Sequence, residues 1–280
     1  MEPLLPKDMI TQPELWRCLL HLTPTRLHAA LTPPPVAGED MVNASILLNP
    51  DTQSELKRIE DAVYDNPLLL SEFRSIHALV WTPDYTVVPA ELAHDRHTAA
   101  RLLAMALGRE VDSHRVSVGC EMGGAVLLYE LPEGTEAFLK RTFFGVTMSH
   151  PLEDVGFEAV RRSEVNLQEP VMIAVADSAN ALTVVAARAG KLLMLNEFAV
   201  THPDDGAYYL LACRSSLGLG RDEGAVMFAG QAPLARTVAN ILAPYIPSTS
   251  FLTTPPELCR YGRNATRLTY PEECYLRNNL

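Results

Sequence analysis

The feature that most constrains the fold is the order of apolar segments between residues 171 and 252. Three β-rich runs follow one another closely, and the tight turn Ala189–Gly190 separates the last two. A helix then begins at Pro203, and Asp204 and Asp205 in its first turn suit the positive end of the helix dipole. The expected elements, in order, are strands 171–175, 181–186 and 192–198, helix 203–217, strand 226–229, helix 233–242 and strand 250–252.

A looser version of this order, with an extra hairpin, occurs between residues 44 and 165. The expected elements are strand 44–48, a hairpin of strands 75–81 and 85–88, helix 91–107, a hairpin of strands 116–120 and 125–129, helix 132–143, strand 146–148 and helix 151–164. Two βββαβα-type lobes around a cleft describe the actin-like ATPase (ribonuclease-H-like) architecture. The sequence therefore predicts an α/β protein of that fold class.

We expect three parts along the chain. Residues 1–40 are predicted to be an N-terminal arm, because Pro33–Pro35 interrupts any regular structure and only Glu14–Leu20 has the pattern of a short apolar helix. Residues 41–168 are expected to form the first actin-like lobe. Residues 169–280 are expected to form the second.

Charge and cysteine content narrow the classes of partner and compartment. The formal net charge is −11 and the pI is near 5.2, which argues against nucleic acid as a partner. Five widely spaced cysteines without a CxxC pair argue against a disulfide framework. No signal peptide and no run of about 20 apolar residues is evident, so we expect a cytoplasmic protein without direct membrane insertion.

Several segments resemble a known family. They are Trp81–Leu92 (WTPDYTVVPAEL), Asp65–Leu70 (DNPLLL), Arg188–Phe198 (RAGKLLMLNEF) and Asp205–Leu211 (DGAYYLL), with a weaker match at Tyr275. They are similar to segments of an uncharacterised domain-of-unknown-function family, widespread in Bacteroidetes, whose members have a similar length. The resemblance implies an actin-like ATPase fold related to the pilus-assembly ATPase-fold proteins. It implies no reaction, because the shared motifs are structural.

An ATPase of this fold needs acids for Mg²⁺ and backbone N–H groups for phosphates at the first hairpin of each lobe. In the second lobe this hairpin carries Asp177, Ser178 and Asn180, whereas Ala174 and Ala176 stand where an Asp-x-Gly motif would be. These three polar residues are the candidate phosphate and Mg²⁺ ligands. They also fit an ordinary β-turn, in which Asp, Ser and Asn are favoured by their local hydrogen bonds.

The other two nucleotide-binding segments are also incomplete. The adenosine position falls at Gly230 and Gln231, where one glycine of the usual pair is missing. An ordinary strand-to-helix turn explains this Gly equally well. In the first lobe, Leu47–Asp51 stands where the phosphate loop is expected, but it has no Gly, and Pro50 lacks an N–H donor.

The leading hypothesis is a non-catalytic module with a degenerate nucleotide site that binds a protein partner or itself. It needs no cofactor. The first alternative is a diverged ATP-binding protein or ATPase that holds Mg-ATP through the five candidate residues, and the second is a sugar-kinase-like phosphotransferase. We expect no metal site, because His94 and His97 lack a further ligand at a suitable spacing. The sequence has no P-loop and no G-x-S-x-G motif.

Overall fold

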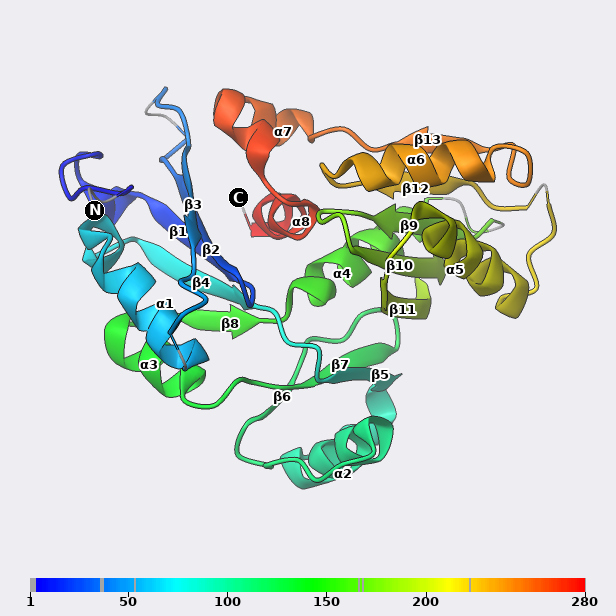
Figure 1. Cartoon of the computed structure of the whole chain (residues 1–280), viewed down its shortest axis with the longest axis horizontal. Coiled ribbons are helices and arrows are strands. Elements are labelled where there is room, and N and C mark those ends of the chain that lie inside the picture. The colour runs from blue at the N-terminus through cyan, green and yellow to red at the C-terminus, as the bar shows by residue number, and fades with distance from the viewer. Residues whose placement is uncertain are drawn as a thin grey trace.

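The structure is a computed structural model that describes residues 4–35, 38–52, 54–165, 167, 169–221 and 223–279. Within them, two five-stranded sheets form the cores of two halves, and a smaller three-stranded sheet is attached to the first half (Figure 1). Both large sheets have the same strand order, β3-β2-β1-β4-β8 in one and β11-β10-β9-β12-β13 in the other. The predicted α/β fold with two related halves is therefore confirmed.

In the first half, three antiparallel strands are continued by two parallel ones. Helices α1 and α3 lie side by side on one face of this sheet (Figure 1). Between them the rings of Tyr64 and Phe138 pack edge to face, with their centroids 6.1 Å apart. The elements are β1 (Arg17–Leu22), β2 (Arg26–Thr32), β3 (Val42–Leu47), α1 (Glu55–Tyr64), β4 (Ser75–Val80), α3 (Thr135–Thr142) and β8 (Thr147–Ser149).

An insertion between β4 and α3 forms the small antiparallel sheet and one helix. The strands are ordered β5-β7-β6, and α2 packs on them. Residues of this helix and of the small sheet form a separate apolar cluster that includes Leu103. The elements are β5 (Tyr85–Pro89), α2 (Arg96–Leu107), β6 (Val116–Val118) and β7 (Ala125–Glu130). Asp95 caps α2 by accepting a hydrogen bond from the Thr98 N–H, and Gly108 ends the helix with a positive φ.

The second half repeats the first without an insertion. Helices α5 and α6 pack against each other and against the sheet, and they share an apolar cluster with β9, β10 and β12. The elements are β9 (Val171–Val175), β10 (Ala181–Arg188), β11 (Lys191–Ala199), α5 (Pro203–Ser216), β12 (Val226–Ala229), α6 (Pro233–Leu242), β13 (Thr249–Phe251) and α7 (Pro256–Cys259).

Each half ends in one helix, and these two helices occupy equivalent places and pack against each other between the sheets (Figure 1). They are α4 (Pro151–Ser163) and α8 (Tyr270–Asn279). Glu158 of α4 is 1 % exposed and accepts hydrogen bonds from Arg161 at 2.7 Å and from Arg277 of α8 at 2.8 Å. A buried carboxylate that is paired in this way fixes the contact between the two helices.

Part of the expected N-terminal arm belongs to the first sheet instead. Residues 17–32 form β1 and β2, and β1 lies in the middle of the first sheet, between β2 and β4. The expected helix at Glu14–Leu20 is instead a short 3-10 turn, Pro13–Leu15, followed by β1. β1 is buried on both faces, so its apolar residues do not alternate with polar ones, and such a run resembles a helix in sequence.

The expected hairpin of residues 75–81 and 85–88 is also wrong. β4 pairs in parallel with β1 and β8, whereas β5 pairs with β7 in the small sheet. The chain leaves the large sheet at the turn around Pro83, where we expected it to return. The other predicted hairpin is confirmed as β6 and β7, and each element predicted for residues 171–252 is present in the expected order.

We predict that Glu158→Ala lowers the free energy of unfolding by about 1–3 kcal/mol, because it removes a buried carboxylate that accepts hydrogen bonds from partly exposed arginines. Urea unfolding measures this change. The control is Glu60→Ala, which removes an ion pair with the exposed Arg141 at 3.4 Å and should cost less than about 1 kcal/mol. Equal losses in the two variants would contradict an ionic link between α4 and α8.

Candidate functional site

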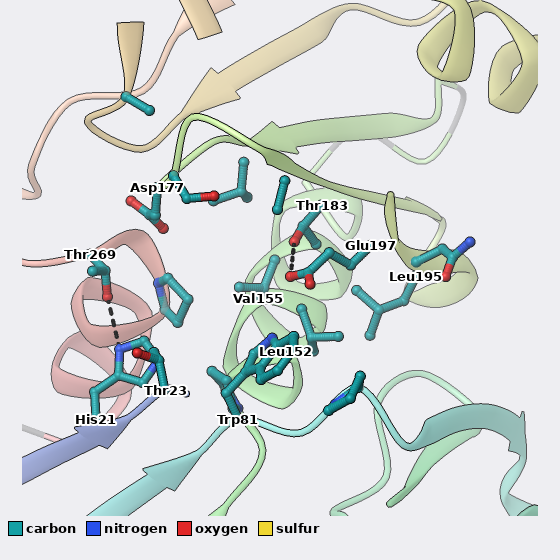
Figure 2. Close-up of a pocket in the computed structure, with 18 of the residues that line it drawn as sticks. His21, Thr23, Trp81, Leu152, Val155, Asp177, Thr183, Leu195, Glu197 and Thr269 are labelled. Carbon is teal, nitrogen blue, oxygen red and sulfur yellow. Dashed lines mark hydrogen bonds between the residues drawn. The ribbon is translucent and has the colours of Figure 1, made fainter. Parts of the chain in front are cut away.

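A cleft of about 1570 Å³ lies between the two halves. The first half contributes the β1–β2 turn and the aromatic residues Trp81 and Tyr85, and the second half contributes the β9–β10 turn and strand β11. Leu152 and Val155 of α4 line its floor (Figure 2). The cleft therefore lies where the fold predicts it, and residues from both halves surround it.

The turn of the first half differs from the one expected. The first hairpin is β1–β2, so its turn is Thr23–Thr25, and Leu47–Asp51 follows the edge strand β3 instead. The Thr23 hydroxyl accepts a hydrogen bond from the Arg26 N–H at 3.1 Å, which closes the turn on itself. This turn has neither an acid nor a glycine, and Pro24 has no N–H to donate. It is poorly suited to holding a phosphate.

The turn of the second half is where the sequence places it, between β9 and β10. Ser178 and Asn180 are exposed there and line the cleft. Asp177 is partly buried, and its Oδ2 accepts a hydrogen bond from the Tyr270 N–H at 3.0 Å. Tyr270 is the first residue of α8, so this carboxylate caps the C-terminal helix.

Burial raises the pKa of Asp177 to about 6, and the nearby charge of Glu272 acts in the same direction. The amides of Tyr270 and Gln231 and the charge of His21 oppose this shift. Asp177 is thus held inside the protein by backbone donors of its own chain.

Gly230 and Gln231 lie next to Asp177, and both have structural roles. Gly230 has a φ of 92°, and a Cβ there would overlap the carbonyl oxygen of Ala176. The Gln231 side-chain amide donates hydrogen bonds to the carbonyl oxygens of Thr266 and Leu268, each at 2.7 Å. Asp177, Ser178, Asn180 and Gln231 therefore line one end of the cleft, and Asp177 and Gln231 bind the C-terminal segment.

Sequence reasoning missed a second cluster at this end of the cleft. His21 and His28 are opposite each other on β1 and β2. The Nδ1 atoms of the two rings lie 2.9 and 2.8 Å from Oε1 of Glu272, which is fully buried in the first turn of α8. Because His21 and Glu272 are 251 positions apart, no local pattern in the sequence could reveal this contact.

The Glu272 carboxylate and the His28 ring each stabilise the charged form of the other. Burial raises the pKa of Glu272, but hydrogen bonds from His21 and His28 outweigh it and hold that pKa well below the usual range. Burial lowers the pKa of His28, but the hydrogen bond and charge of Glu272 raise it above the ordinary value of 6.5. The other oxygen of Glu272 accepts a hydrogen bond from the Thr269 N–H at 2.8 Å. The cluster joins the first hairpin to α8.

Other sites are not supported in the described part of the chain. His94 and His97 are exposed at the start of α2, and no group of three potential metal ligands occurs among the described residues. None of the helices in those residues is long and apolar enough to span a bilayer.

The family of this chain is identified by a match to a protein-family model. A family described as "Protein of unknown function (DUF3822)" matches residues 41–249. The chain belongs to this family. The match does not extend to β1, β2 or α8, which carry the histidine and glutamate cluster. No curated protein matches the sequence.

Solved structures show the same fold. A protein from Bacteroides thetaiotaomicron, described as having an actin-like ATPase fold and unknown function, is 14% identical, with a TM-score of 0.73 over 87% of this chain and 93% of that one. The PilM-PilN type IV pilus biogenesis complex gives 12% identity and a TM-score of 0.53 over 94% and 97% of the two chains. These findings confirm the family and the actin-like fold inferred from the sequence.

We predict a pH-dependent coupling between His28 and Glu272. His28 has a raised pKa when folded, so its stabilising contribution is complete below pH 6.5 and is lost as the pH rises through the raised value. The coupling free energy should be about 1–3 kcal/mol at low pH and should decrease at higher pH.

A double-mutant cycle of His28→Gln and Glu272→Gln, measured by urea unfolding from about pH 5 to about pH 9, gives this energy. A coupling that does not change with pH would show that His28 carries no proton in the pair.

Proposed function

We propose that this protein is a non-catalytic actin-like module that acts through contact with another protein or with a second copy of itself. The observation that supports this most is the use of the two best-placed polar side chains, Asp177 and Gln231. Both are bonded to the backbone of residues 266–270. A triphosphate would have to replace these bonds before it could use Oδ2 of Asp177 or the Gln231 amide.

The chemistry of the two turns supports the same proposal. Phosphate binding requires several N–H donors that converge on one point. The first turn contains a proline, and the second contains a carboxylate that accepts a helix N–H. Neither turn offers the arrangement that would hold a triphosphate with Mg²⁺.

A protein partner is in keeping with the structural relatives. The PilM-PilN structure is a complex of two proteins, and its likeness to this chain makes a similar use of the fold a reasonable hypothesis. We further propose a cytoplasmic location. All five cysteines are free thiols, three of them buried, as suits a reducing compartment.

We predict that isothermal titration with Mg-ATP at up to about 1 mM shows no saturable heat, because the C-terminal segment already occupies Oδ2 of Asp177 and the side-chain amide of Gln231. Saturable binding with a Kd below about 100 μM that is lost in Asp177→Ala would overturn the proposal in favour of a diverged ATP-binding protein. Asp204→Ala is the matched control, since Asp204 is an exposed acid on α5. Sedimentation velocity over a range of concentrations tests self-association.

A further inference from the structure

The middle of the cleft contains an acidic group that the proposed function leaves unused. Glu197 lies on β11, and Figure 2 shows its carboxylate pointing into the pocket toward α4. The Thr183 hydroxyl donates a hydrogen bond to it at 3.3 Å, and the Glu197 N–H donates one to the Tyr85 hydroxyl at 2.9 Å. These contacts fix both the side chain and the strand that carries it.

The surroundings of Glu197 are apolar and aromatic. Trp81 approaches from the first half, Leu152 and Val155 from α4, and Leu195 from β11 (Figure 2). Tyr85 of β5 also lines the cleft. Burial raises the pKa of Glu197, and hydrogen bonds from Trp81 and Thr183 oppose that shift. A carboxylate in such a place has lost part of its hydration.

No positively charged side chain compensates for this loss within the described residues. None of the ion pairs found there includes Glu197. Arg26 and Arg267 also line the cleft, at the start of β2 and in the segment before α8, and neither is in an ion pair with Glu197 among the described residues. A carboxylate that is fixed, partly dehydrated and without a counterion favours a cation from outside the chain.

We infer that this part of the cleft binds an arginine side chain of the protein partner, with the guanidinium on Glu197 and the aliphatic stem against Leu152 and Val155. A guanidinium forms two parallel hydrogen bonds to a carboxylate and stacks on aromatic rings such as those of Trp81 and Tyr85. The aliphatic stem matches the apolar floor. A metal ion is a poor occupant, since Glu197 is not part of any group of three potential ligands among the residues that the structure describes.

The inference rests on the proposed function, because the arginine belongs to a protein partner. It adds the chemistry by which that partner is recognised and the position at which it enters. Trp81 and Glu197 come from different halves, so a bound arginine would contact both. The net charge of −11 also favours a basic partner.

The experiment uses n-butylguanidinium as a probe of the arginine side chain and n-butylurea as its neutral counterpart. The chain has two tryptophans, and Trp16 is buried in the first half, so Trp16→Phe assigns the indole N–H signal of Trp81 in a ¹⁵N NMR spectrum. We expect a saturable shift of the Trp81 signal with n-butylguanidinium, with a Kd of about 1–20 mM for so small a ligand. The shift should be at least about tenfold weaker in Glu197→Gln and unchanged in Glu133→Gln, an exposed acid outside the cleft.

An equal shift with n-butylurea, or no saturable shift with n-butylguanidinium, would overturn the inference. The comparison of the two ligands on the unmodified protein remains decisive even if Glu197→Gln fails to fold. Binding of Mg-ATP at Asp177 would overturn the proposed function instead, so the two failures are distinguishable.

Discussion

The hydrogen bond from the Tyr270 amide to Asp177 connects the C-terminal helix to the hairpin turn where an actin-like protein would hold phosphate. Its effect extends beyond one bond, because α8 begins there and continues between the two sheets to Arg277, which binds the buried Glu158 of α4. The Gln231 amide holds the segment that leads into the helix. Together these contacts make the C-terminal segment a structural part of the cleft end, and they leave the middle of the cleft open.

Because the two halves have the same topology, the caps of their last helices, α4 and α8, can be compared directly. His150 precedes helix α4 and caps it, because its Nδ1 accepts a hydrogen bond from the Leu152 N–H. Helix α8 is capped by Asp177, which comes from a different element. Both helices also have a local cap, because Glu153 accepts a hydrogen bond from the His150 N–H and Glu272 accepts one from the Thr269 N–H. The second half adds a tertiary cap, in which the acid of the hairpin turn holds the first amide of α8.

The second half could be predicted from the sequence because its strands are separated by clear turns, such as Ala189–Gly190, and its helices begin at proline and end near glycine or alanine. The first half was harder to predict. β1 is buried on both faces, and the insertion that begins at β5 hides the repeat. Four of the five candidate site residues line one end of the cleft, but the partners of Asp177, Gln231 and His21 lie far away in the chain. Only the folded structure shows them.

The central claim is that the start of α8 occupies Asp177, the acid in the hairpin turn of the second half. Hydrogen exchange of the Tyr270 amide, followed by NMR with and without saturating Mg-ATP, tests it most directly. If Asp177 holds this amide as part of the stable structure, its exchange is slow and is the same in both samples. Fast exchange without nucleotide, or a rate that changes when Mg-ATP is added, would show that the turn is available to a phosphate and would contradict the account.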